Sequence, residues 1–159
     1  MRVQSSGHFD VALSAGDAIV LFTPEGERSW VPGWNPVYPA GRPSEDSGTV
    51  FVTESHGVET TWVVLEVDRS GATAAYARIT PGHHAGVVRV GCVDAATGQC
   101  TVSVAYDLTL LGEDPMELVA HVDDNFELMM HEWSNAVAAH LGGPPPAPGE
   151  GNVVGSETT

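Results

Sequence analysis

Residues 115–141 read PMELVAHVDDNFELMMHEWSNAVAAHL and predict one long helix near the end of the chain. Asp114 is placed to cap the first turn, Pro115 stands at the first helical position, and Glu117 completes a capping box. The Gly-Gly-Pro sequence at 142–144 ends the helix. Such a helix would be roughly 40 Å long, which is enough to cross a small domain.

One face of this predicted helix is apolar. Its hydrophobic side chains recur at the helical period and form a stripe about 120° wide. A stripe of this length needs a large partner surface, and the residues before the helix read mostly as strands. The sequence therefore predicts a sheet packed over the long helix. The stripe consists of Val119, Val122, Phe126, Met129, Met130, Trp133, Val137 and Leu141.

The middle of the chain is predicted to form an antiparallel meander. Apolar and polar residues alternate in short segments that are separated by turn-forming residues. The alternation is clearest at the last segment, where Val102, Val104, Tyr106, Leu108 and Leu110 share one face. One face of the sheet is therefore expected to meet water and the other to meet the helix. The expected strands are 49–55, 60–68, 72–80, 86–93 and 101–111.

A strand and two short helices are expected before the meander. Residues 8–14 alternate enough to form the strand. Ser14 opens a capping-box pattern for a helix that ends near Phe22. Thr23 and Pro24 restart a second helix, because a capping residue precedes a proline at the first helical position.

The order of these elements predicts an α+β protein with one domain. Residues 1–142 contain the first strand, the two short helices, the meander and the long helix, and residues 35–48 read as a loop. Residues 143–159 are rich in proline, glycine and acidic residues and are expected to be a disordered tail.

The chain is strongly acidic, with a formal net charge of −15 over 159 residues. A phosphate backbone would be repelled, so nucleic acid is not an expected partner. No apolar run approaches the roughly 18 residues of a membrane span, and residues 1–10 carry no secretory signal pattern. We therefore expect a cytoplasmic protein without membrane insertion, as a monomer or a homodimer.

The two cysteines flank a turn signal at residues 94–99. A four-residue hairpin loop there would pair Cys92 with Thr101 and Val93 with Cys100. The two thiols would then lie on opposite faces of the sheet, which argues against a disulfide.

Three stretches and the closing helix resemble the START/Bet v 1-like (SRPBCC) superfamily, including its polyketide cyclase/dehydratase-like and lipid-transport-like members. They are FTPEGERSWVPGW at 22–34, GTVF at 48–51 and TPG at 80–82, with Trp133 and Leu141 in the helix. The resemblance covers roughly residues 5–142. It implies a helix-grip fold, in which a curved antiparallel sheet wraps around one long C-terminal helix and leaves a hydrophobic cavity between them. The superfamily includes ligand carriers, cyclases, hormone receptors and co-chaperone domains.

The third predicted strand has two candidate inner faces. If Tyr76, Arg78 and Thr80 face inward, Arg78 is a buried cation that could hold a carboxylate, enolate or phenolate, with Tyr76 beside it. The other face of this strand, with Ala75, Ala77 and Ile79, is more apolar and is therefore the better candidate for the inner face. This favours the interpretation in which Arg78 lies on the surface. Arg89 is placed outside for the same reason.

Candidate site residues follow from these faces. Arg78, Tyr76 and Tyr106 are the candidate catalytic groups. No metal or cofactor is expected, because the histidines of the long helix do not share a face and HEWSN at 131–135 lacks the second histidine of a zinc motif. The cavity candidates are Phe51, Thr53, Val104, Tyr106, Leu108, Phe126, Met129, Met130 and Trp133.

Three functions remain open at this point. The first is binding of a small hydrophobic or aromatic ligand in the cavity. The second is a cofactor-independent polyketide cyclase or dehydratase, in which polar groups of the cavity assist proton transfer. The third is a co-chaperone-like interaction domain with a collapsed core.

Overall fold

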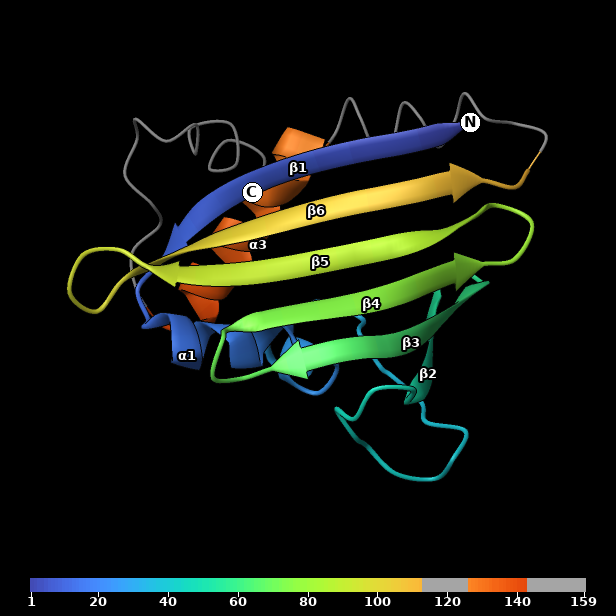
Figure 1. Ribbon diagram of the computed structural model, residues 1–159, viewed down its shortest axis with the longest axis horizontal. Coiled ribbons are helices and arrows are strands. Elements are labelled where there is room, and N and C mark those ends of the chain that lie inside the picture. Colours follow the sequence, from blue (N-terminus) through green and yellow to red (C-terminus); the bar gives the residue numbers. More distant parts are fainter. Residues whose placement is uncertain (113–125, 143–159) are drawn as a thin grey trace.

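Six antiparallel strands form one sheet in the computed structural model, which describes residues 1–112 and 126–142. Their order across the sheet is β1-β6-β5-β4-β3-β2. The sheet faces the viewer in Figure 1, and the helix α3 lies behind it. The strands are β1 (Arg2–Val11), β2 (Val50–Ser55), β3 (Val58–Asp68), β4 (Thr73–Thr80), β5 (His84–Asp94) and β6 (Cys100–Leu110).

The meander expected from the sequence is confirmed by the pairing of β2 through β6, each with the next. β1 then pairs with β6 along its whole length, from Arg2 opposite Thr109 to Val11 opposite Cys100. The first strand therefore begins six residues before the predicted segment 8–14. Residues 4–7 read Gln-Ser-Ser-Gly and have a weak strand propensity. They form a strand because they pair with β6, so the sequence of this segment alone does not show where β1 begins.

Three short helical turns follow β1 where two short helices were predicted, and the predicted capping residues Ser14 and Thr23 both accept amide hydrogen bonds. α1 (Ala15–Ala18) begins after Ser14, whose Oγ accepts a hydrogen bond from the Asp17 amide at 3.3 Å. The 3₁₀ turn η1 (Ile19–Phe22) continues from it. Thr23 Oγ1 accepts from the Gly26 amide at 3.1 Å and opens the 3₁₀ turn η2 (Gly26–Ser29). These bonds satisfy amides that a helix start would leave without partners.

The core lies between the sheet and the helices. Val102, Val104, Tyr106 and Leu108 of β6 are all buried, which confirms the predicted inner face of that strand. Phe22 of η1 also reaches this core and is 1% exposed. Its ring centroid lies 5.5 Å from that of Trp30 and 6.3 Å from that of Trp133 on the closing helix. The short turns are therefore tied to the core by aromatic rings.

The described part of the closing helix is α3 (Phe126–His140). Phe126, Met130 and Val137 of the predicted stripe are buried, and Gly142 ends the helix in a left-handed conformation with a φ of 73°. Leu141 follows the last helical residue and is exposed, so it does not belong to the packed stripe. The predicted first part of the helix, from Asp114 to Val122, and the predicted tail 143–159 lie outside the described residues.

The hairpin that carries the cysteines differs from the prediction. Its loop has five residues, 95–99, so Asp94 pairs with Cys100 and Cys92 with Val102. This one-residue change in register places both cysteines on the buried inner face, because side chains alternate along a strand. Both are free thiols, and burial raises the pKa of Cys92 to about 12.

Candidate ligand cavity between the sheet and the helix

A cavity of about 600 Å³ lies against the inner face of the sheet. We call it the inner cavity. Its walls come from strands β2 to β6, from the segment 22–34 and from Trp133 of α3. Its volume falls within the roughly 300–1,000 Å³ of small-molecule pockets. Six aromatic side chains line it: Phe22, Trp34, Trp62, Tyr76, Tyr106 and Trp133.

Trp34 and Trp62 offer ring surface to the cavity and no free N–H. Trp34 donates its Nε1–H to the Pro24 carbonyl at 2.8 Å, and Trp62 donates its Nε1–H to Thr53 Oγ1 at 2.9 Å. Their ring centroids lie 5.7 Å apart in an edge-to-face arrangement. Because these donors are already bound within the protein, the two rings can contact a ligand only through apolar and π surfaces.

Arg78 lies on the inner face, together with Tyr76 and Thr80, which corrects the reading that placed it on the surface. Its guanidinium carbon lies 5.3 Å from the centre of the Trp62 ring and 5.7 Å from that of Tyr106. Gly86 stands opposite Arg78 on β5, and a Cβ there would clash with the backbone of β6 at Asp107 and Leu108. Contact with two aromatic faces stabilises the half-buried cation.

The two tyrosines differ in what their hydroxyls can do. Tyr76 donates to the Phe22 carbonyl at 2.8 Å and thereby fastens η1 to the sheet. Burial raises its pKa, so the hydroxyl stays protonated and committed to this bond. Burial also raises the pKa of Tyr106, while nearby Arg78 acts in the opposite direction. The Tyr106 ring packs edge-on against Phe126, with centroids 5.3 Å apart.

Glu27 also lines the inner cavity and was missed by the sequence analysis. It lies on η2, three residues before the buried Trp30, and a residue at this spacing points to the same side of a helical turn. Desolvation raises the pKa of its carboxyl well above the usual value. The negative charge of Glu27 also raises the pKa of Tyr76 and of Tyr106. The three groups therefore lie in one electrostatic environment.

A row of polar side chains crosses the inner face next to Arg78. We call Thr60, Thr80 and His84 the polar row. Thr60 Oγ1 lies 2.7 Å from Thr80 Oγ1, and Thr80 Oγ1 lies 3.2 Å from His84 Nε2. His84 is 4% exposed. Burial, followed by the charge of Arg78, lowers the pKa of His84 to about 4, so the imidazole is neutral at pH 7.

The predicted cavity residues divide into two groups. Thr53, Tyr106 and Trp133 line the inner cavity. The others pack in or against the surrounding core without lining it: Phe51, Val104, Leu108, Phe126, Met129 and Met130.

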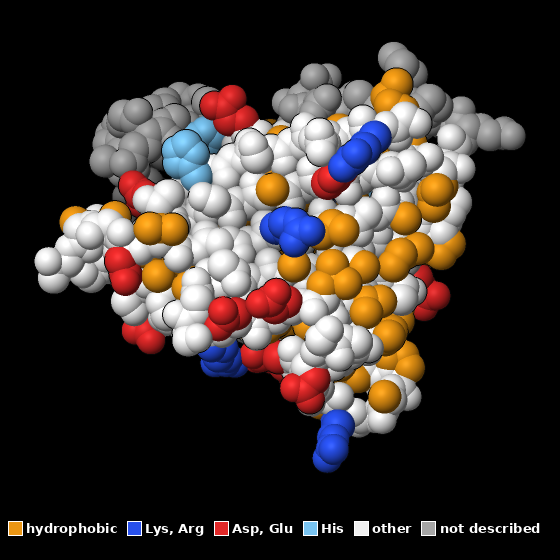
Figure 2. All heavy atoms as spheres, viewed as in Figure 1, with side chains coloured by type: hydrophobic (Ala, Val, Ile, Leu, Met, Phe, Trp, Pro, Cys, Tyr) orange, Lys and Arg blue, Asp and Glu red, His pale blue; other side chains and the backbone are white. Residues whose placement is uncertain are grey.

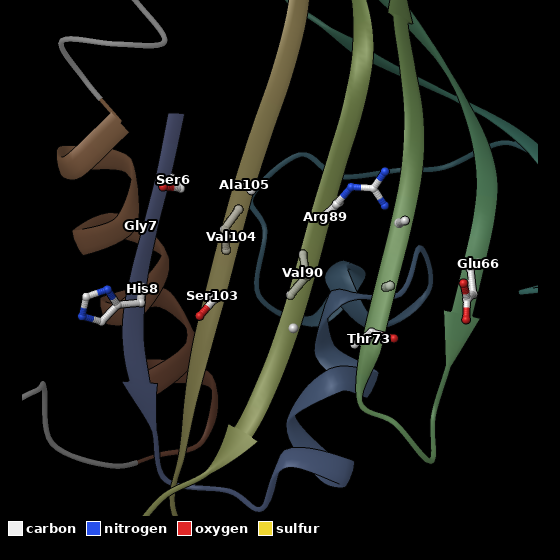
Figure 3. A pocket seen from close by; sticks show the side chains of 13 residues that line it. Ser6, Gly7, His8, Glu66, Thr73, Arg89, Val90, Ser103, Val104 and Ala105 are labelled. Carbon is white, nitrogen blue, oxygen red and sulfur yellow. The ribbon is translucent and has the colours of Figure 1, made fainter. Parts of the chain in front are cut away.

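A second hollow, of about 530 Å³, lies over the solvent-facing side of the sheet. We call it the outer groove, and Figure 3 shows His8, Ser103, Arg89 and Glu66 around it. Small residues such as Gly91 and Ala105 form its floor, and no aromatic side chain lines it. Figure 2 shows the same side of the molecule, with apolar side chains gathered toward the right of the view and most charged side chains at its centre and lower edge. The inner cavity is therefore the stronger candidate site.

Solved structures with this architecture are numerous. Ara h 8.0201 superimposes with a TM-score of 0.65 at 10% identity, over 89% of this chain and 99% of that one. The Zhui aromatase/cyclase from Streptomyces sp. R1128 gives 0.64 at 14% identity, over 89% and 94% of the two chains. Norcoclaurine synthase from Thalictrum flavum gives 0.61 at 13% identity, over 89% and 87%.

The chain has the Bet v 1-like helix-grip fold. These likenesses concern the fold alone, because the sequence identities are low. No protein-family model and no curated protein sequence matches the chain.

Two further properties concern the described residues only. Within residues 1–112 and 126–142, no group of three histidine, cysteine, aspartate or glutamate side chains is arranged to hold a metal ion. In the same part of the helix-grip domain, no helix has both the length and the apolarity needed to cross a membrane.

The lowered pKa of His84 predicts a pH dependence of stability. The unfolded chain binds a proton at His84 near pH 6.5, whereas the folded chain binds it only near pH 4. The free energy of unfolding should therefore fall as pH falls from 6.5 to 4, by at most about 3 kcal/mol from this group. Urea unfolding of the wild type and His84→Gln at several pH values measures the difference. His83→Gln serves as the control. An identical pH slope in all three proteins would contradict the assignment.

Proposed function

We propose that this chain binds a small aromatic or hydrophobic ligand in the inner cavity. The observation that carries the proposal is an aromatic-lined space of about 600 Å³ between the sheet and α3, with polar side chains on part of its wall. Apolar walls with a small number of placed polar groups are the usual composition of a small-molecule site. The flat faces of Trp34 and Trp62 favour a planar ring system as the occupant.

Proteins of the same fold give this proposal indirect support. One structure of norcoclaurine synthase from Thalictrum flavum contains dopamine and hydroxybenzaldehyde, which are both small aromatic molecules. The third hypothesis, an interaction domain with a collapsed core, requires that side chains fill this space. A cavity of this volume argues against it.

Trp34→Leu tests the proposal. The probe is naphthalenemethanol, a neutral molecule with two fused rings, and the readout is quenching of tryptophan fluorescence. We expect the wild type to bind it and Trp34→Leu to bind roughly tenfold more weakly, because one aromatic wall is lost. Tyr38→Leu is the matched control. Tyr38 packs on Phe51 as Trp34 does, with centroids 5.9 and 6.2 Å away, but it does not line the cavity.

The two variants separate a local role from a general loss of packing. Equal weakening in Trp34→Leu and Tyr38→Leu would mean that disturbance around Phe51, rather than the cavity wall, controls binding. No saturable binding of the probe to the wild type would contradict the proposed function.

A cyclase or dehydratase-type enzyme is the second candidate function, and Glu27 is the observation that favours it. A carboxyl with a raised pKa on the wall of a largely aromatic cavity is suited to proton transfer, because desolvation makes its carboxylate a stronger base. Arg78 could stabilise negative charge that develops on a ligand oxygen in the same cavity. Of the predicted catalytic set, Arg78 and Tyr106 are thus better placed than Tyr76, whose hydroxyl is already bound.

A model reaction tests Glu27 without knowledge of the natural substrate. In nitrobenzisoxazole, a base removes the ring C–H proton, the N–O bond breaks, and a cyanophenolate forms. We expect the wild type to accelerate this reaction, with a rate that rises as Glu27 ionises, and Glu27→Gln to lose at least about 100-fold. Glu25→Gln changes an exposed carboxylate on the same segment and should retain the rate. Unchanged catalysis in Glu27→Gln would remove the support for an enzyme.

A further inference from the structure

Glu27 carries a carboxyl that has no partner on the wall of the inner cavity. The residue lines the cavity and is half-buried. Among the described residues its carboxyl oxygens accept no hydrogen bond and form no ion pair. They also differ from Arg78 Nε and His84 Nδ1, which have no partner either but are shielded from solvent. A ligand group in the cavity can therefore reach the Glu27 carboxyl.

The backbone of η2 holds Glu27 at the cavity wall. The Glu27 carbonyl accepts hydrogen bonds from the amides of Trp30 at 3.3 Å and Val31 at 2.9 Å. Residues three and four positions apart in a helical turn lie on one side of it. Val31 also lines the cavity, and the Trp30 ring packs on Phe22 and Trp133 at centroid distances of 5.5 Å each. The turn is thus anchored to the core, and its place at the wall does not depend on a ligand.

We infer that Glu27 forms a subsite that binds the ammonium group of an aromatic or hydrophobic amine. This inference rests on the proposed ligand cavity and adds the chemical class of its occupant. An ammonium group donates hydrogen bonds and carries the positive charge that the Glu27 carboxylate lacks. The apolar part of the amine would lie against the aromatic walls, whose ring faces also attract a cation.

The charged residues around the cavity favour a cationic ligand over an anionic one. Apart from His56, the acidic and basic residues that line it are Glu27, Glu54 and Arg78. Glu54 lies near the end of β2, where it, Ser55 and His56 are all exposed and line the open side of the cavity. An entering cation would thus pass one carboxylate and reach a second one inside. The net charge of −15 attracts cations at longer range.

A cation at Glu27 would offset the hydration that its carboxyl has lost. Desolvation raises the pKa of Glu27, and no positive charge of the described residues lowers it. An ammonium group supplies that charge and favours the ionised carboxylate. Arg78 is held at the sheet, against the rings of Trp62 and Tyr106. Because Arg78 does not act on the Glu27 carboxyl, its repulsion of an ammonium group bound there should also be weak.

Naphthalenemethanamine and naphthalenemethanol test the inference, because they carry an ammonium group and a neutral hydroxyl on the same ring system. The full chain is titrated with each by isothermal calorimetry at physiological salt. We expect the wild type to bind the amine at least about tenfold more tightly than the alcohol. Glu27→Gln keeps the shape of the side chain and should bring the two affinities within about twofold of each other. Glu25→Gln removes an exposed carboxylate two residues away and should retain the preference.

The outcomes separate this inference from the proposed function. Equal affinity of the wild type for both probes would overturn the amine subsite and leave the ligand cavity in place. Failure of both probes to bind would overturn the proposed function and this inference with it. A preference that survives Glu27→Gln, or that disappears equally in Glu25→Gln, would overturn the subsite, because contact with Glu27 would then not be its cause.

A second measurement decides the question on the wild type alone, should Glu27→Gln fail to fold. At about 1 M salt, charges are screened beyond about 3 Å. Direct contact with Glu27 inside the cavity should keep most of the preference for the amine, because partly buried pairs are screened less. A preference that disappears at this salt concentration would come from the acidic chain as a whole and would overturn the subsite.

Discussion

The close approach of α3 to β1 is the constraint on which the rest of the structure depends. Gly7 makes this approach possible, because a Cβ there would lie only 2.8 Å from Cγ of Met130 and 3.2 Å from the ring of Phe126. The described part of the helix is thus held against one edge strand, while the sheet curves away toward β3 and β2. A straight helix cannot follow a curved sheet along its whole width. The aromatic rings of residues 22–34 and Trp133 close part of the gap, and the remaining space is the inner cavity.

The ionisable groups that line this cavity lower the stability of the folded protein, because they have lost water without gaining a charged partner. Glu27 has lost much of its hydration, and Arg78 has no counter-ion among the described residues. Each of these states is unfavourable in an empty protein, and a fully apolar wall would be more stable. Perturbed ionisable groups gathered in one concave space are typical of functional sites. The same feature supports both the ligand-binding and the proton-transfer proposals, since each uses a charge that the fold alone does not need.

Local signals in the sequence predicted the elements, but they did not predict which groups meet. The caps at Ser14 and Thr23 and the alternation of β6 depend on near neighbours and could be read directly. The inner face of β4 could not, because Ala77 and Ile79 lie on an outer face that also carries Val63 and Val87, and Arg78 faces inward between aromatic rings. Glu27 became a site residue only because η2 packs against η1 at the wall of the cavity. The cysteine hairpin was predicted wrongly because its loop has one more residue than expected. A shift of one residue in register moves the side chains of one strand to the opposite face of the sheet relative to the other strand.

The most direct test of the central claim is native mass spectrometry of the freshly purified protein, followed by solvent extraction of whatever it releases. Binding in the inner cavity predicts a reproducible mass increase from one small molecule per chain, and the extract should contain an aromatic or hydrophobic compound. A protein that keeps its bare mass, both as purified and after incubation with aromatic amines, polyketides and lipids, would contradict the claim that this cavity is a ligand site.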